Sequence, residues 1–414
     1  MTKRIAPSYP YFDSLNQMLA DDYIYEPSII GSHFDDYLIA KRFLLSYKGS
    51  QDTFNAYRRD IERFLQWCQL VASKHLKQIQ RQEFESYLDF CKKPPKTWIG
   101  LRNEPRFIVK NGQRVINKKW RPFVISLSKA DTRQGITPNK KYYSLSEKTF
   151  KALFAVISTF YNFLIQENYV TINPVLLIRQ KSKYLKKTNI EPKIRRLSEL
   201  QWGYVLKAAE MSADKNPERY ERSLFILNTL YGMYLRISEL TVTERWTPTM
   251  GDFERDLDGH WWFNTVGKGN KARKITVSDA MLKALKRYRK SLGLPALPHV
   301  GEGTPLISKS RVAEPVKSVR YIRVLVQETF DKAILQLQDD NQAEEAEQLV
   351  AATVHWLRHT GISDDVKIRP REHVRDDAGH SSSAITDKYI DIELRARHLS
   401  GKKKRIKPEC MLDD

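Results

Sequence analysis

Two segments in the second half of the sequence carry side chains suited to phosphoryl transfer without a metal ion. One contains Arg236 followed by Glu239, and the other holds Lys268 between Gly267 and Gly269. A guanidinium can bind two phosphate oxygens at once, and an ammonium at the tip of a turn can deliver a proton to a leaving oxygen. Each segment also has an ordinary explanation. Arg236 and Glu239 could form a helical ion pair, and the lysine segment could be a basic hairpin.

Two further segments supply imidazoles, a second guanidinium and a phenol. His355 and Arg358 are three residues apart, so on a helix they share one face and could reach the same phosphate. A Gly-His pair ends at His380, and Tyr389 follows nine residues later. A phenol oxygen can act as a nucleophile, although a tyrosine at helical spacing from isoleucines is usually core packing. Each of these patterns could occur by chance on its own.

The order of these four segments resembles that of the tyrosine recombinases of the phage-integrase family, which includes the Xer proteins, Cre and lambda integrase. The resemblance covers the chain from about Arg196 to Leu399. The segments from Ser50 to Trp67 and from Ser146 to Pro174 resemble that family's core-binding domain less specifically.

The resemblance implies that Arg236 and Arg358 clamp the nonbridging oxygens of a DNA phosphate. Arginine suits this role because it stays charged and binds oxygen pairs in a bidentate manner. His355 and His380 would complete the cradle, with His355 also assisting as a base.

By the same resemblance, Lys268 is the general acid for the departing 5′ oxygen, and Tyr389 attacks to leave a 3′-phosphotyrosine link. Glu239 would support Arg236 or a neighbouring helix. Because the phosphotyrosine conserves the bond energy, the reaction implied needs no ATP, metal or other cofactor.

Composition favours a nucleic acid as the partner. The 414 residues include 70 Lys+Arg and 49 Asp+Glu, giving a net charge of +21, which attracts polyanions. Residues 34–190 hold 30 basic and 12 acidic side chains, against 38 and 33 in residues 191–414. We therefore expect the first half to provide the main DNA-binding surface.

The cysteines argue against a zinc site or a disulfide framework. Cys68, Cys91 and Cys410 share no metal-ligand spacing. The sequence has neither a long apolar run nor a signal-peptide pattern, so we expect a soluble protein of the cytoplasm, associated with the nucleoid of a bacterium, and no membrane partner.

The chain is long enough for two domains. We expect residues 1–33 to be a loosely ordered leader, residues 34–185 a helical DNA-binding domain, and residues 186–196 a basic linker. Residues 197–399 would form the catalytic domain, and residues 400–414 a basic tail that either docks on a neighbouring protomer or is disordered.

The predicted fold is mainly α with a small β-hairpin or sheet: a helical, SAM-like core-binding domain followed by a mixed α+β catalytic domain. Helical periodicity predicts helices over five segments, 50–67, 82–90, 146–166, 198–212 and 219–232, with a short helix through Val175 and Ile178. Residues 260–277 are predicted to form a β-hairpin. The acidic stretch 337–348 should face solvent.

Residues 92–141 form a basic insertion with 14 basic and two acidic side chains and interleaved aromatics. Basic side chains can neutralise phosphates while aromatics pack or stack, so we expect DNA contact; a small satellite core is the alternative. The candidate DNA-binding residues of the whole chain are Arg58, Arg59, Lys118, Lys119, Arg121, Lys271 and Arg273.

One departure from the family pattern concerns the segment before Tyr389. Residues 361–379 are far more polar than usual there, and Ala378 stands where leucine is commoner, so we expect atypical packing around the nucleophile.

The expected partners are double-stranded DNA with a specific recombination site and a homo-tetramer assembled on it from free monomers, with an accessory DNA-bending or directionality protein as a further candidate. Integration or excision of a mobile element is favoured over chromosome-dimer resolution. The alternatives are a type IB topoisomerase, which would need no defined site, and a DNA-binding protein that has lost catalysis.

Overall fold

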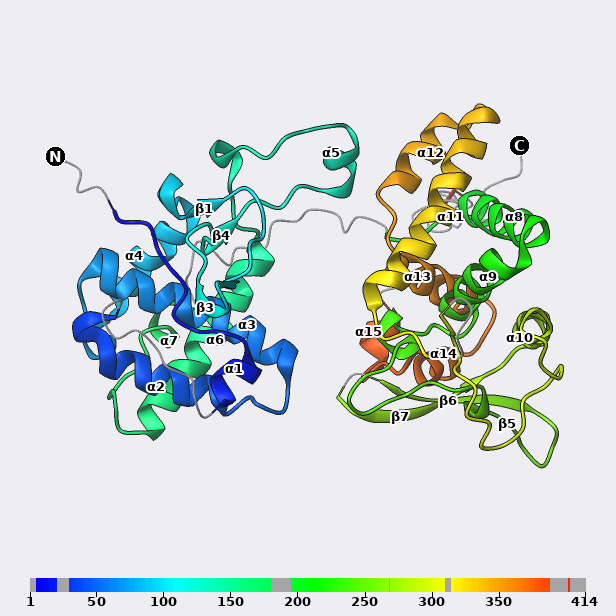
Figure 1. Cartoon of the computed structure of the whole chain (residues 1–414), viewed down its shortest axis with the longest axis horizontal. Helices are drawn as coiled ribbons and strands as arrows, with labels where there is room; N and C mark the ends of the chain where they lie inside the picture. Colours follow the sequence, from blue (N-terminus) through cyan, green and yellow to red (C-terminus); the bar gives the residue numbers. More distant parts are fainter. Residues whose placement is uncertain are drawn as a thin grey trace, which may run out of the picture. The chain divides into compact units, whose positions relative to one another are not determined.

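The computed structural model describes residues 5–20, 30–179, 195–267, 269–309, 314–387 and 401–402. The chain divides into two compact units, Met1–Ile190 and Glu191–Asp414, and each is described by itself (Figure 1). The predicted linker lies outside the described residues except for Arg195 and Arg196, and the C-terminal tail does so except for Gly401 and Lys402. None of the described helices is both long and apolar enough to cross a membrane.

The first unit is a bundle of helices around an aromatic core. Its longer helices are α2 (Phe34–Leu45), α3 (Gln51–Trp67), α4 (Arg81–Lys92) and α6 (Glu147–Gln166), followed by the short α7 (Leu176–Arg179). Phe54, Phe64, Phe84 and Phe160 are fully buried among these helices. The helices predicted from periodicity are therefore confirmed, because their apolar stripes meet in one core.

The predicted loose leader is wrong for the part of it that is described. Tyr11 and Phe12 are buried in the helical core, and α1 (Leu15–Leu19) adds Leu15 and Met18 to it. The backbone amides of Tyr11 and Phe12 donate to Glu62 Oε1 at 2.7 and 3.0 Å. Residues 5–14 of this segment form no helix or strand, so the buried residues there follow no helical period.

The insertion between α4 and α6 packs two of its aromatics into the core of the first unit. Trp98 and Phe123 are fully buried, and β1 (Ile99–Gly100) pairs in parallel with β4 (Phe123–Val124). The hairpin of β2 (Phe107–Lys110) and β3 (Gln113–Ile116) turns at Asn111 and Gly112, both with positive φ, as such two-residue turns require. Trp98 and Phe123 belong to the same core as the helices of the first unit, so the satellite-core interpretation is wrong for them.

The second unit has eight described α-helices and a three-stranded antiparallel sheet. The helices are α8 (Glu199–Lys215), α9 (Pro217–Gly232), α10 (Asp279–Ser291), α11 (Val319–Asp339), α12 (Ala343–Val350), α13 (Val354–Asp365), α14 (Arg371–Ala378) and α15 (Ser383–Asp387), together with the one-turn 3-10 helix η8 (Ile237–Leu240). Helix α9 lies at the centre, in contact with α8, α10, α11 and α13.

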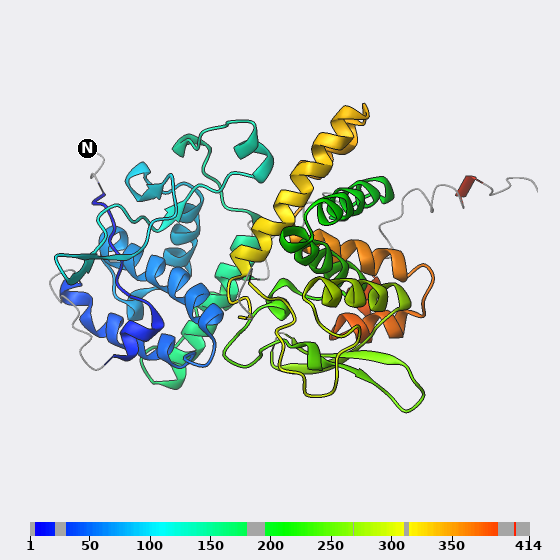
Figure 2. The ribbon, with the colours of Figure 1, turned by 45° about the vertical axis from the view of Figure 1, so that its right-hand side comes forward.

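The sheet has the order β5 (Phe253–Arg255), β6 (Trp261–Gly267) and β7 (Lys271–Thr276). Strands β6 and β7 confirm the predicted hairpin, and β5 extends it. Helix α14 packs against β7, and Figure 2 shows this helix lying beside the β6–β7 hairpin. The prediction that the acidic stretch 337–348 faces solvent is also confirmed. Its exposed residues around the junction of α11 and α12 are Asp339, Asp340, Glu344 and Glu347.

Candidate active site

Arg236 lies between the end of α9 and the start of η8. Tyr234 adopts a positive φ of 50° just before it, which turns the chain out of the helix. The Arg236 amide donates to Glu239 Oε2 at 2.8 Å, and its Nη1 donates to Glu239 Oε1 at 3.0 Å. The predicted pair therefore exists, but it closes a one-turn 3-10 helix and not a regular α-helix.

Arg358 projects from α13 and is almost completely buried, with 2% of its surface exposed. Its Nη1 donates to the Tyr234 carbonyl oxygen and its Nη2 to the Ala378 carbonyl oxygen. Helix α13 approaches α9 closely because residue 361 is glycine, and a Cβ there would overlap the Tyr231 carbonyl oxygen. The packing of α13 on α9 thus brings this guanidinium to the chain just before Arg236.

The two guanidiniums meet at the turn that precedes His380. Arg236 Nη2 donates to the Gly379 carbonyl oxygen at 3.3 Å, next to the Ala378 oxygen that binds Arg358. Gly379 has a φ of 63° and ends helix α14. Residues separated by more than 120 positions therefore converge on two adjacent peptide groups.

Glu239 also forms an ion pair with Arg273, which the sequence analysis predicted to bind DNA. Arg273 Nη1 and Nη2 donate to Glu239 Oε1 and Oε2 at 2.7 and 2.8 Å, and Arg273 Nε donates to the Asp377 carbonyl oxygen at 3.0 Å. Glu239 is 2% exposed and the Arg273 side chain 9%. The guanidinium of Arg273, which was predicted to bind DNA, thus neutralises a buried carboxylate behind Arg236.

The charge on Glu239 is secured by this pairing. Burial opposes ionisation, but hydrogen bonds from Arg273 and the positive charges of Arg273 and Arg236 outweigh it and lower the pKa of Glu239. Gly267 makes the cluster possible, since a Cβ on it would lie 2.8 Å from Arg273 Nη1 and 2.9 Å from Glu239 Oε1.

The imidazoles beside the guanidiniums are held neutral. Loss of water around His380, together with Arg358, Arg236 and Arg273, lowers its pKa to about 4. Partial desolvation and the charges of Arg358 and Arg236 lower the pKa of His355 as well. Both rings can therefore accept a proton at neutral pH. His380 Nδ1 lies 3.0 Å from the Thr386 hydroxyl of α15.

A third histidine, His359, belongs to this cluster and was missed at the sequence level. Its ring meets that of His355 edge to face with centroids 4.3 Å apart. Desolvation comes first, and the neighbouring His355 imidazole and the charge of Arg358 also lower the pKa of His359, to about 4. Its position four residues after His355 was the available signal, because such residues lie one helical turn apart.

The polar run 361–379 forms an ion-pair network behind the site. Arg369 donates to Asp377 Oδ2 at 2.7 Å, to Asp365 Oδ2 at 3.2 Å and to the Tyr234 hydroxyl at 3.0 Å. Asp377 in turn accepts from the Thr276 amide of β7 at 3.2 Å. The expected atypical packing is thus a charged layer that joins α13, α14 and β7.

The structure brings together Arg236, His355, Arg358, His380 and Glu239. The two remaining residues with predicted roles, Lys268 and Tyr389, lie outside the described residues. Their described neighbours are Gly267, which packs on the Glu239 cluster, and Asp387, the last residue of α15.

The other candidate DNA-binding residues differ in how much of their charge remains available. Lys118, Lys119 and Lys271 are exposed. The Arg59 side chain is 49% exposed while pairing with Asp60 at 3.1 Å.

Arg58 and Arg121 already serve the fold. Arg58 donates to the Asp13 carbonyl oxygen and to Asn55 Oδ1. Arg121 Nη1 donates to the carbonyl oxygens of Lys118 and Trp120, at 2.7 and 2.6 Å.

Two guanidiniums and neutral imidazoles form a site suited to a tetrahedral oxyanion. The guanidiniums can donate to nonbridging oxygens, and the imidazoles can donate or accept a proton. Among the described residues, neither His/Asp group with metal-binding proximity includes a member of this cluster. These side chains are chemically able to bind a phosphate and to transfer a proton.

Comparisons with known proteins point to one family. Residues 34–98 match the phage integrase N-terminal SAM-like domain. A stretch of 145 residues is 29% identical to the tyrosine recombinase XerD of Rickettsia bellii, covering 35% of this chain and 44% of that protein. Another of 167 residues is 24% identical to the tyrosine recombinase XerC of Chlorobaculum parvum, covering 38% and 47%. The chain thus matches less than half the length of these curated relatives.

Two solved structures share the fold over most of the chain. One is the XerH site-specific recombinase bound to palindromic difH substrate as a post-cleavage complex, with a TM-score of 0.55 and 13% identity, covering 95% of this chain and 99% of that one. The other is a lambda integrase dimer bound to a COC′ core site, with a TM-score of 0.51 and 14% identity, covering 95% and 87%. At such identities the likeness establishes the fold alone.

Proposed function

We propose that this chain, a relative of the tyrosine recombinases of the phage-integrase family, cleaves and rejoins DNA strands at a specific site through a covalent link to Tyr389. The observation that carries the proposal is the convergence of Arg236 and Arg358 on the turn before His380. A simple ion pair between Arg236 and Glu239, or ordinary core packing, would not require both guanidiniums to lie at this turn.

In the proposed reaction, Arg236 and Arg358 bind the nonbridging oxygens of one backbone phosphate. Attack by the Tyr389 oxygen builds negative charge on those oxygens, which guanidiniums stabilise. The phenol proton passes to His355, whose lowered pKa keeps it neutral and able to accept. His380 donates a further hydrogen bond to the phosphate.

The bond from phosphorus to the 5′ oxygen breaks as Lys268 gives that oxygen a proton. The products are a 3′-phosphotyrosine and a free 5′ hydroxyl. Attack by a 5′ hydroxyl from a partner strand reverses these steps and joins new ends, so no ATP is consumed.

The exposed basic residues Arg59, Lys118, Lys119 and Lys271 are proposed to contact DNA phosphates around the site. We further propose that strand exchange takes place in a homo-tetramer on DNA and serves the integration or excision of a mobile element. An accessory DNA-bending or directionality protein would then select the direction.

The test uses a nicked suicide duplex carrying the attachment sequence found beside the gene. Cleavage next to the nick releases a short strand and traps the protein–DNA adduct, which is then detected by denaturing electrophoresis. The wild-type chain should form the adduct, and Tyr389→Phe should not. An adduct that persists in Tyr389→Phe would disprove the assigned nucleophile.

A second substrate tests the general acid. Lys268→Ala should cleave an ordinary 5′-oxygen substrate slowly but a 5′-thiolate substrate at nearly the wild-type rate, because a thiolate leaves without a proton. Failure of this rescue would assign the acid to another group. A product in which the cleaved strand is joined to a new partner strand would indicate recombination, because a topoisomerase rejoins only the original strand.

A further inference from the structure

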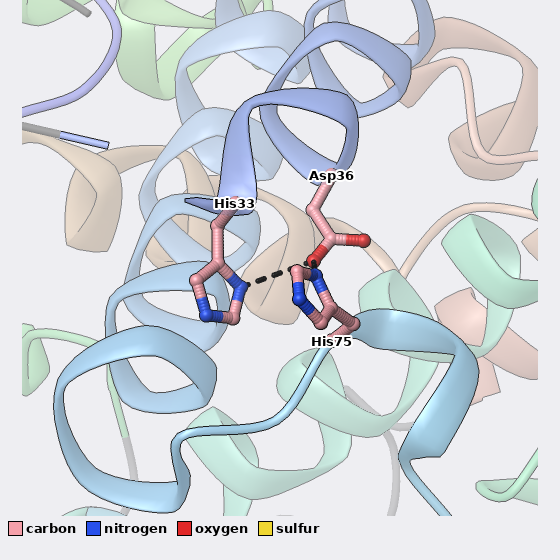
Figure 3. Close-up of side chains that lie close together, drawn as sticks. All are labelled: His33, Asp36 and His75. Atoms are coloured by element: carbon pink, nitrogen blue, oxygen red, sulfur yellow. Dashed lines mark hydrogen bonds and ion pairs between the residues drawn. The ribbon is translucent and has the colours of Figure 1, made fainter. Parts of the chain in front are cut away.

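Two histidines and one aspartate of the first unit converge on a single oxygen atom (Figure 3). His33 ends the 3-10 turn η2 (Gly31–His33), Asp36 lies in the first turn of α2, and His75 precedes the 3-10 turn η4 (Leu76–Gln78). Nδ1 of His33 and Nδ1 of His75 lie 3.1 and 3.0 Å from Asp36 Oδ2. The two rings stack with centroids 4.3 Å apart.

The carboxylate at the centre is oriented by groups behind it. Asp36 is 1% exposed, and its Oδ1 accepts a hydrogen bond of 2.8 Å from the Tyr169 hydroxyl. The Leu76 amide lies 3.3 Å from both carboxylate oxygens. These contacts hold the side chain so that Oδ2 faces both imidazoles. A supporting shell of this kind is typical of ligands in metal sites.

We propose that His33, Asp36 and His75 bind one divalent transition-metal ion of the zinc type. Two imidazole nitrogens with one carboxylate oxygen are a donor set that suits zinc, whereas calcium and magnesium prefer oxygen ligands alone. With bonds of about 2.0–2.1 Å, the ligand atoms of a tetrahedral zinc site lie about 3.3 Å apart. The Nδ1–Oδ2 separations here differ from that value by only a few tenths of an ångström.

Metal binding moves the proton of each imidazole from one ring nitrogen to the other. Without metal, each Nδ1–H can donate to Asp36 Oδ2. With metal, the proton of each neutral imidazole lies on Nε2, so both Nδ1 lone pairs and Oδ2 become ligands without net release of a proton. The His33 side chain is 12% exposed and that of His75 42%, so the His75 side of the site is open to water as a fourth ligand.

The metal ion would join segments that are distant in the sequence. His33 and Asp36 begin α2, while His75 follows α3 and the turn after it. The cysteine spacing that argued against zinc could not reveal this site, because its ligands are histidines 42 positions apart. The site lies in the first unit, and the proposed strand cleavage does not involve it.

The experiment measures binding of zinc and cobalt to the full-length chain after removal of metal by a chelator. Calorimetry should give one equivalent of bound zinc, and bound cobalt should give the strong visible absorption of a tetrahedral site. Zinc in large excess over its dissociation constant should raise the melting temperature by about 5 °C, because it binds only the folded state.

Two conservative variants separate metal binding from hydrogen bonding. In His33→Asn and His75→Asn, the amide nitrogen can replace Nδ1–H as donor to Asp36, but it is a poor zinc ligand. Each variant should keep the metal-free melting temperature while weakening zinc binding at least 10-fold. The matched control is His260→Asn, since His260 lies near Asp256 and Asp258 in the other described His/Asp group. It should bind zinc as the wild type does.

Three results would overturn the proposal. They are the absence of stoichiometric binding at micromolar zinc, unchanged binding in both His33→Asn and His75→Asn, and loss of binding in His260→Asn. The suicide-substrate reaction is measured separately, so a failure of this site leaves the proposed recombinase activity untouched.

Discussion

Arg273 and Glu239 form a bidentate pair, with hydrogen bonds of 2.7 and 2.8 Å between guanidinium and carboxylate. The pair connects strand β7 to the 3-10 turn that begins at Arg236. A bidentate contact fixes both direction and distance. Because Glu239 also accepts from Arg236, the position of the Arg236 guanidinium depends on a strand that lies more than 30 residues further along the chain.

Replacing Arg273 should impair folding more than DNA binding. Arg273→Ala leaves the buried Glu239 carboxylate with only one arginine, which should lower the free energy of unfolding by about 3 kcal/mol. Lys271→Ala is the matched control, because Lys271 is exposed on the same strand. It should weaken DNA binding without changing stability. Urea unfolding and salt-dependent DNA titration test this, and equal stabilities of the two variants would contradict it.

Gly267 should tolerate no side chain. Gly267→Ala places a Cβ 2.8 Å from Arg273 Nη1 and 2.9 Å from Glu239 Oε1. We expect DNA cleavage to fall at least about 10-fold, because roughly 1.4 kcal/mol of lost positioning is sufficient for that. The control is Gly203→Ala in α8, where no atom lies within 4 Å. It should preserve cleavage and stabilise the chain by about 0.5–1 kcal/mol. Wild-type cleavage by Gly267→Ala would show that the cluster can rearrange.

Acid should destabilise the folded chain partly through His380. Its pKa of about 4 lies below the ordinary value near 6.5. Between these two values the unfolded chain binds more protons than the folded one, so the free energy of unfolding falls as the pH drops through this window.

The variant His380→Asn removes this contribution. Asparagine can keep a hydrogen bond to Thr386, and we expect a shallower loss of stability between pH 6.5 and 5. Urea unfolding at several pH values measures the slope. His373→Asn, at an exposed position on α14, serves as the control and should leave the slope unchanged. The same slope in wild type and His380→Asn would refute the assignment.

The insertion should divide into residues that bind DNA and residues that hold the fold. Lys118 and Lys119 are exposed, so replacing both with alanine should reduce the salt dependence of DNA binding by about two phosphate contacts. Arg106 pairs with Glu62, which is 1% exposed, and its guanidinium lies 4.8 Å from the centre of the Trp120 ring.

Arg106→Ala should therefore destabilise the first unit by about 3 kcal/mol, because it removes the partner of a buried charge. Thermal unfolding measures this loss of stability in Arg106→Ala. Filter binding over a series of salt concentrations measures the phosphate contacts that the lysine variant loses. A lower melting temperature in the lysine variant, with an unchanged melting temperature in Arg106→Ala, would contradict this division between DNA binding and folding.

Periodicity was sufficient to predict helices α3, α4, α6, α8 and α9, but it did not identify α2 or α11. Phe54, Phe64 and Phe160 recur at helical spacing and meet in one core. The N-terminal segment was missed because Tyr11 and Phe12 lie outside any helix or strand, and only the tertiary contact with Glu62 marks them as core residues.

The cluster around Arg236 could be predicted only in part. Arg236, His355, Arg358 and His380 were identified from spacing and family resemblance. The role of Arg273 could not be, since an arginine in a basic hairpin gives no sign that a carboxylate 34 positions earlier will lie opposite it. Long-range electrostatic pairing of this kind appears only after the chain has folded.

The buried N-terminal segment has a practical consequence for recombinant work. Trimming the chain to residue 34, where the SAM-like match begins, would delete Tyr11, Phe12, Leu15 and Met18 from the core. It would also remove the two backbone amides that bind Glu62. A fragment shortened in this way should misfold or aggregate, even though it retains every residue assigned to chemistry.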